Sequence, residues 1–155
     1  MNTSSHSMSA FGGGISTVVL ASRKGGVLLE RIYDPELADH RQATLRDFIQ
    51  SAELEGLICA NQEGDDSASE EAFTSLYKRH NLVFQRIPES DVVLFCSGKL
   101  DQNHARVASV IECFLFCLIE VLNRKSVTED RIIKNYSKVC LLLDEMLNEV
   151  SVEES

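Results

Sequence analysis

The chain has 155 residues, of which 44% are hydrophobic and 25% are charged, and this balance predicts one globular domain rather than a disordered segment. Its formal net charge of -9 argues against a nucleic-acid-binding protein, which needs a basic surface to displace counterions from phosphates. The same charge disfavours unassisted docking on an anionic bilayer, so we expect any membrane association to be indirect.

The cysteines and the apolar segments point to a cytoplasmic protein. The five cysteines include no CxxC pair, and four of them lie in apolar runs, where cysteine behaves as a small buried hydrophobe. The apolar run 107–122 is too short to span a bilayer and is interrupted by Glu112 and Glu120. We find neither an export signal nor a lipidation motif, and we expect the chain to stay in the cytoplasm.

The first third of the chain predicts a tail, a hairpin and a helix. Residues 1–14 are rich in serine and glycine and are expected to be disordered. β-Branched runs at 17–22 and 27–33 flank the turn Lys24-Gly25-Gly26, which indicates a β-hairpin. Because this glycine pair leads into a strand and lacks the rest of a Walker motif, it is not interpreted as a phosphate loop. Asp34-Pro35 then predicts a helix start, and apolar residues recur at helical spacing to about residue 53.

The remaining two thirds predict three strands and two helices. An acidic loop at 61–71 precedes strand candidates at 73–78, 82–87 and 91–97. The last of these contains a continuous apolar run, which is typical of a strand near the centre of a sheet. A helix is expected from 101 to 123 and another from Thr128, while 151–155 forms a disordered end. The whole order is ββα, βββ, αα within one domain at 15–150.

Three segments carry a family resemblance. They are TVVLASRKGGVLLERIYD at 17–34, DVVLFCSGKLDQNHARVASVIECFLFCL at 91–118, and VCLLLDEM at 139–146. Together they resemble the longin-type small subunits of vesicle-coat adaptor complexes, namely coatomer zeta, clathrin-adaptor sigma and the small subunit of the TSET/TPLATE type. The resemblance implies an α+β fold, with a five-stranded antiparallel sheet and helices on both faces. Leu28 and Phe114 depart from the residues that line the dileucine cargo site of clathrin sigma subunits.

The resemblance also implies a function without chemistry. It implies a non-enzymatic subunit of a heterotetrameric coat in vesicle-mediated transport, paired with a large helical-solenoid subunit and accompanied by a medium subunit. Such a subunit is peripheral on Golgi, endosomal or plasma membranes through its complex. The alternative is a longin or roadblock-type regulatory or tethering subunit that binds a small GTPase. Neither interpretation involves nucleic acid, a small-molecule substrate or a cofactor.

The helix at 104–122 offers the candidate partner-binding residues. Its apolar side chains extend nearly all round, and such a helix is buried on more than one side. We therefore expect one set of residues to divide between the core and a groove of the large subunit: Val107, Ile111, Phe114, Leu115 and Leu118.

No catalytic, cofactor-binding or metal-binding residue is predicted. The four histidines, His6, His40, His80 and His104, share no ligand spacing and are interpreted as solvated or interface residues. Asp144 and Glu145 are adjacent on a predicted helix and therefore point about 100° apart, so they do not form an acid–base pair.

Overall fold

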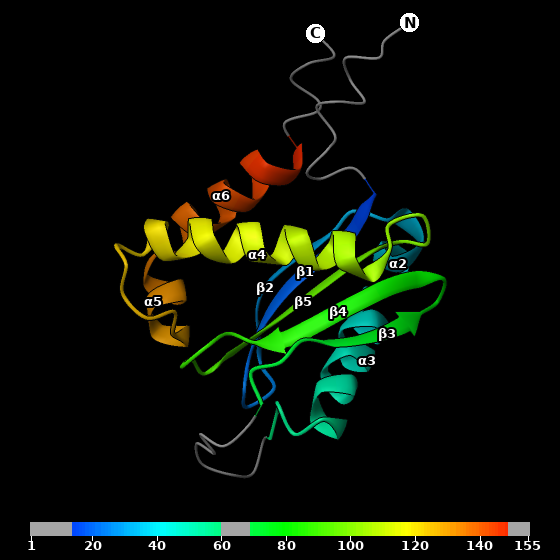
Figure 1. Cartoon of the computed structure of the whole chain (residues 1–155), viewed down its shortest axis with the longest axis horizontal. Helices are drawn as coiled ribbons and strands as arrows, with labels where there is room; N and C mark the ends of the chain where they lie inside the picture. The colour runs from blue at the N-terminus through cyan, green and yellow to red at the C-terminus, as the bar shows by residue number, and fades with distance from the viewer. Residues whose placement is uncertain (1–13, 60–68, 149–155) are drawn as a thin grey trace, which may run out of the picture.

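The computed structural model describes residues 14–59 and 69–148, and these form a five-stranded sheet with helices on both faces (Figure 1). The elements are β1 Ile15–Ser22, β2 Val27–Ile32, α2 Pro35–Asp39, α3 Arg41–Leu54, β3 Phe73–Tyr77, β4 His80–Arg86, β5 Val92–Lys99, α4 His104–Val121, α5 Glu129–Lys134 and α6 Tyr136–Asn148. The predictions for the two disordered ends and for most of the acidic loop concern residues outside the described ranges.

The sheet confirms the predicted five antiparallel strands and the central place of the most apolar strand. Its order is β2-β1-β5-β4-β3, and every neighbouring pair is antiparallel. β5 lies in the middle of the sheet, and its residues are buried apart from Lys99. A strand covered on both faces has no polar side to present to water, which explains its continuous apolar run.

The β1–β2 turn is the predicted hairpin. Gly25 has a φ of +101°, a conformation that a residue without a Cβ adopts at little cost. Around it the Ser22 amide donates to the Gly26 carbonyl at 2.7 Å, and the Gly25 amide donates to the Ser22 carbonyl at 2.9 Å. This closed turn leads straight into β2, so it forms no phosphate loop.

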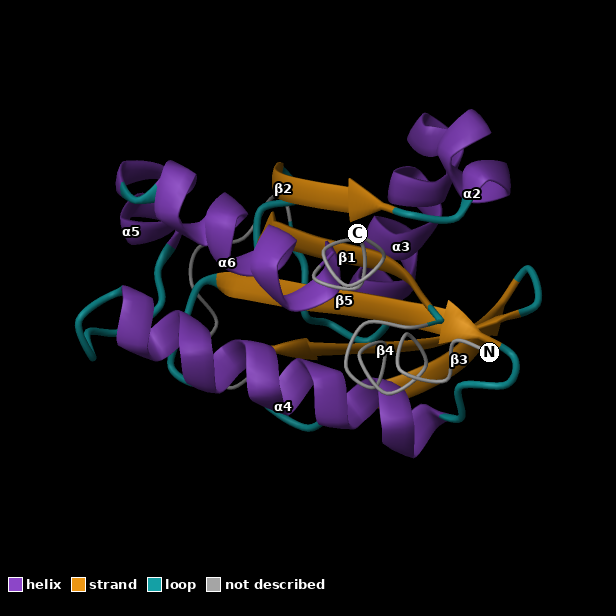
Figure 2. Cartoon of the chain, turned by 90° about the horizontal axis from the view of Figure 1, so that it is seen from above, coloured by secondary structure: helices purple, strands orange, loops and turns teal. Residues whose placement is uncertain are grey.

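Each face of the sheet has its own apolar core. On one face α4, α5 and α6 cover residues of β1, β2, β4 and β5, and on the other face α3 covers alternate residues of β1, β4 and β5. Figure 2 looks down on the first layer, with α4 and α6 in front of the strands and α3 behind them. The second core holds a stack of aromatic rings, in which Phe48, Phe84 and Phe95 lie at centroid distances of 5.6 Å.

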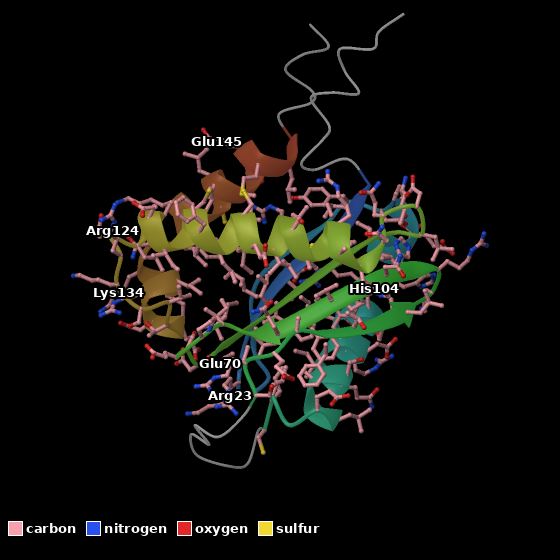
Figure 3. All side chains as sticks on the ribbon, in the orientation of Figure 1. Arg23, Glu70, His104, Arg124, Lys134 and Glu145 are labelled. Carbon is pink, nitrogen blue, oxygen red and sulfur yellow. The ribbon has the colours of Figure 1, made fainter. Side chains whose placement is uncertain are left out.

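Helix α4 is the longest of the described helices, and it packs on the sheet over β4 and β5. It begins at the N-cap Asn103, whose side chain accepts a hydrogen bond from the Arg106 amide at 2.8 Å. Figure 3 shows His104 at the start of the helix and Arg124 just beyond its end, on opposite sides of the molecule. The predicted helix is therefore confirmed, with its ends trimmed by two or three residues.

Two of the predicted helices are each broken in two. The first breaks at His40, between α2 and α3, and the last breaks at Asn135, between α5 and α6. Neither position holds glycine or proline, so the sequence carries no local signal for the break. The break at His40 lets α2 bury Leu37 beside the sheet while α3 buries Phe48 in the second core. Thr128 is the predicted N-cap, and its hydroxyl accepts from the Arg131 amide at 3.2 Å.

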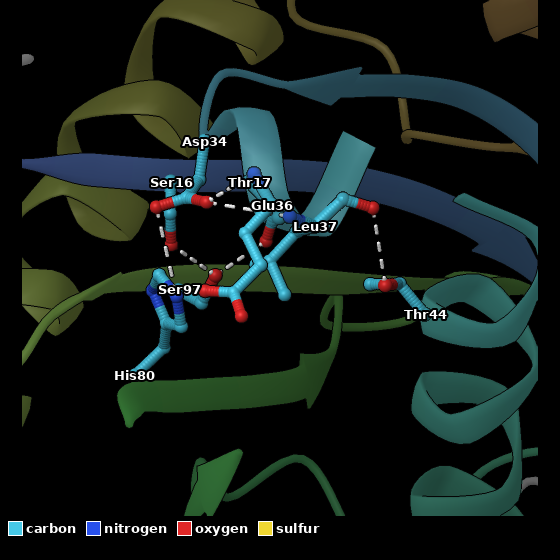
Figure 4. A network of polar contacts seen from close by, with 8 residues as sticks. All are labelled: Ser16, Thr17, Asp34, Glu36, Leu37, Thr44, His80 and Ser97. Carbon is cyan, nitrogen blue, oxygen red and sulfur yellow. Dashed lines mark hydrogen bonds and ion pairs between the residues drawn. The ribbon is translucent and has the colours of Figure 1, made fainter. Parts of the chain in front are cut away.

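A polar network lies under α2, and it corrects one prediction (Figure 4). The Ser97 hydroxyl lies 2.7 Å from the hydroxyls of both Ser16 and Thr17. Asp34 caps α2, and its carboxylate lies 3.7 Å from the His80 ring. His80 was interpreted as a solvated or interface residue, which is wrong, because it is only 5% exposed. It shares its side of β4 with buried residues of the second core, and that side faces inward.

Candidate partner-binding surface

The five predicted partner residues lie on, or at the edge of, the side of α4 that faces the sheet. Four of them are no more than 2% exposed and belong to the chain's own core: Val107, Ile111, Phe114 and Leu118. Leu115 is half-buried at the edge of that core. The described chain therefore already fills most of this face with its own sheet and helices. Their contact with a partner stays a prediction, and Leu115 is the member of the set that reaches the surface.

The outer side of α4 carries the exposed apolar residues. Phe116 is 68% exposed and Ile119 is 41% exposed, whereas Phe114 is 2% exposed. Two residues along an α-helix are separated by about 200°, so Phe114 and Phe116 must point in nearly opposite directions. An aromatic ring that stays exposed to water contributes little hydrophobic stabilisation to the free chain. An exposed apolar surface of this kind is typical of a protein interface.

Helix α6 lies beside α4 and extends the exposed apolar surface. Leu141 on α6 is 58% exposed, and Leu142 is half-buried against the same core. Cys113 and Cys117, one turn apart on α4, are both partly exposed. We call the exposed set Phe116, Ile119 and Leu141 the outer apolar face. It lies over the first core, with the half-buried Leu115 at its edge.

The thiols beneath and beside this face are protonated at neutral pH. Burial raises the pKa of the Cys96 thiol to about 12. Desolvation also raises the pKa of the Cys113 thiol, and its neighbour Cys117 adds to the shift. Because the thiolate is the reactive form, these thiols pack as small apolar groups.

Residues 14–59 and 69–148 show neither a metal-binding cluster nor a membrane-spanning helix. Within them no three His, Cys, Asp or Glu side chains gather as a metal site. None of their helices combines the length and the apolar character needed to cross a bilayer. Asp144, one of the two acidic residues considered above, lies 3.2 Å from Arg31 and ties α6 to β2. That contact has a structural role.

Comparison with known proteins decides the family. The model of the clathrin adaptor complex small chain family matches residues 14–155. The chain belongs to this family. Members are non-enzymatic subunits of vesicle-coat adaptor complexes, so the predictions of the family, of vesicle transport and of a role without catalysis are confirmed.

Other comparisons add less. A roadblock/LC7 domain from Streptomyces avermitilis matches with 17% sequence identity and a TM-score of 0.39, covering 74% of this chain and 93% of that domain. No curated protein matches the sequence significantly. The fold assignment therefore rests on the strand order and layers of this adaptor small chain itself.

The sequence alone distinguishes the outer residues of α4 from the inner ones only in part. Phe116 and Ile119 extend the apolar pattern beyond the stripe that one sheet covers, and this excess was the signal for a second contact. However, a helix that is apolar nearly all round has no single preferred side. The neighbouring sheet decides that Phe114 turns inward and Phe116 outward.

Proposed function

We propose that this adaptor small chain is the small subunit of a heterotetrameric coat complex and that it docks on a large helical-solenoid subunit through the outer apolar face. A medium subunit completes the same complex. The complex is cytoplasmic and peripheral on Golgi, endosomal or plasma membranes. The observation that carries the proposal is Phe116, an aromatic residue that is 68% exposed in the C-terminal half of the longest described helix of a family member.

The physical case is the burial of apolar surface. Fully burying a Phe, Ile or Leu side chain stabilises a complex by about 1.5–3 kcal/mol for each residue. Phe116 and Leu141 are more than half exposed in the free chain and Ile119 is 41% exposed, so roughly half of this gain is available to a partner. A solenoid of paired helices offers an extended concave surface, which suits the convex pair of helices α4 and α6.

The five residues predicted from the sequence fit this proposal in two roles. Leu115 lies at the rim and is proposed to contact the partner directly. The four buried members hold α4 against the sheet and so fix the direction in which Phe116 and Ile119 point. The proposal thus rests on a rigid helix whose inner side is already packed.

The test is affinity purification of the tagged chain from its own cells, followed by mass spectrometry. The wild-type chain is expected to recover two large solenoid subunits and a medium subunit. Phe116→Glu is expected to lose them, because a buried, unpaired carboxylate opposes docking. Leu54→Glu is the matched control: Leu54 is 85% exposed at the end of α3, on the other face of the sheet.

Two results would refute the proposal. One is equal recovery of the large subunits by Phe116→Glu and by the wild-type chain. The other is recovery of a small GTPase in a nucleotide-dependent way without any large subunit, which would favour the regulatory or tethering alternative.

A further inference from the structure

Positive charge gathers at one corner of this acidic protein. The chain carries a formal net charge of -9, yet residues 120–138 hold five cationic side chains and three carboxylates. A fourth carboxylate, that of Asp91, accepts from the Glu129 amide at 2.9 Å, so the cations exceed the carboxylates here by one. The five are Arg124, Lys125, Arg131, Lys134 and Lys138, and we call them the basic corner. They follow the end of α4, the connecting loop, α5 and the first turn of α6. Figure 3 shows Arg124 and Lys134 at the same side of the molecule, opposite to His104.

The carboxylates of this region neutralise only part of the charge. Arg124 pairs with Glu120 at 3.2 Å and Lys134 pairs with Asp130 at 3.0 Å, both at i,i+4 spacing. The two cationic side chains remain 79% and 71% exposed, so these pairs are weak and solvated. Among the described residues no ion pair engages Lys125 or Lys138, and both are exposed.

The backbone holds the cationic loop in a costly conformation. Asn123 and Arg124 both have a φ of +61°, and the Arg124 amide donates to the Ile119 carbonyl at 2.8 Å. Asparagine adopts this left-handed conformation readily, but an arginine adopts it only at a cost in free energy. A glycine at position 124 would adopt this conformation at the C-terminal end of the helix without that cost. A cation is therefore fixed just beyond the end of α4, at a position where the fold alone favours glycine.

Apolar side chains accompany the charge. Ile133 on α5 is 56% exposed and Tyr136 at the start of α6 is 45% exposed. Exposed cations mixed with isolated apolar and aromatic side chains are typical of surfaces that lie at the headgroup level of a bilayer. A site for an acidic protein segment needs a shaped groove, whereas a bilayer needs only a convex corner of this composition.

We propose that the basic corner contacts an anionic lipid surface directly, with Lys125, Lys134 and Lys138 among the phosphate headgroups and Ile133 at their depth. The attraction of each cation near such a surface is small, and the net charge of the whole chain opposes it. The contact therefore orients a chain that its coat already holds at the membrane, where a weak second contact acts at high effective concentration. This inference does not depend on which subunit covers the outer apolar face.

The test is co-sedimentation of the full chain with a large excess of vesicle lipid at low ionic strength, so that a weak contact is measurable without the coat. One set of vesicles contains phosphatidylserine and phosphatidylcholine in equal parts, and the other contains phosphatidylcholine alone. The wild-type chain is expected to bind the anionic vesicles only and to be released by salt. The double variant Lys125→Glu, Lys138→Glu is expected to lose at least about tenfold in partitioning, because each lost cation removes a several-fold contribution.

A matched double variant distinguishes a specific effect of the basic corner from a general effect of the net charge. Lys78→Glu with Lys99→Glu makes the same change in charge at exposed residues at the opposite end of β4 and β5, and it is expected to bind like the wild-type chain. Equal loss in both double variants would overturn the proposal, as would wild-type binding no stronger to anionic than to neutral vesicles. Corner-dependent binding to polyglutamate without vesicle binding would also overturn it, in favour of an acidic protein partner.

Discussion

Replacing Phe114 or Phe116 by alanine tests the two sides of α4 separately. The two residues have the same chemistry, lie two positions apart on one helix, and are 2% and 68% exposed. Phe114→Ala leaves a cavity between α4, the sheet and α6, and such a deletion in a core costs about 3–5 kcal/mol. Since domains are stable by only about 5–15 kcal/mol, this change removes a large part of the total.

Phe116→Ala is expected to leave the stability of the free chain nearly unchanged. A substitution at an exposed position usually stays within about 0.5 kcal/mol, and the higher helix propensity of alanine offsets the small loss of contact. The same variant is expected to weaken binding to the large subunit, whereas Phe114→Ala acts on folding first. Phe114→Ala is thus expected to have the larger effect on stability, and Phe116→Ala the larger direct effect on binding.

The assay is urea unfolding of the free chain, followed by circular dichroism. With a urea dependence of about 2 kcal/mol per molar, Phe114→Ala should lower the midpoint by about 2 M and Phe116→Ala should leave it in place. Equal shifts for both variants would refute the assignment of the inner and outer sides of α4. A shift for Phe116→Ala alone would mean that the helix is rotated about its axis.

Three further predictions concern the stability of the free chain. Asp34→Ala removes the N-cap of α2 and should cost about 1 kcal/mol, whereas Asp34→Asn keeps a capping oxygen and should cost less; thermal unfolding distinguishes them. Burial raises the pKa of Cys96 from 9.0 to about 12, so the stability that the neutral thiol provides is intact below pH 9 and is lost as the pH rises toward 12. Between pH 8 and pH 11 the free energy of unfolding should therefore fall by about 3 kcal/mol more in the wild-type chain than in Cys96→Ala. Asp144→Ala breaks the half-exposed pair with Arg31 and should cost less than about 1 kcal/mol in denaturant unfolding, with a smaller effect in high salt.

The elements that follow from local rules were predictable. The hairpin was indicated by Gly25-Gly26, the central strand by its apolar run at 92–96, and the start of α5 by Thr128, and the structure has all three. In each case the deciding interaction lies within a few residues or follows from one simple periodicity.

The features that depend on distant neighbours were not predictable. The breaks at His40 and Asn135 have no glycine or proline, so they are set by what each half-helix packs against. His80 is buried and its ring lies 3.7 Å from the carboxylate of Asp34, a residue far from it in the sequence. The same holds for α4, where only the position of the sheet distinguishes the inner Phe114 from the outer Phe116.

The outer apolar face and the basic corner adjoin each other, and this constrains how the chain is held. Arg124 follows the end of α4, and its amide donates to the Ile119 carbonyl at 2.8 Å. In the proposed complex, a large subunit that binds Phe116 and Ile119 would border the basic corner, and its surface there must leave the cations open toward the membrane. Burial of apolar surface depends little on salt, whereas attraction to lipid phosphates is screened by it. Raising the ionic strength should thus release the corner from anionic vesicles while the subunits remain paired, and loss of both contacts at the same salt concentration would argue against two separate surfaces.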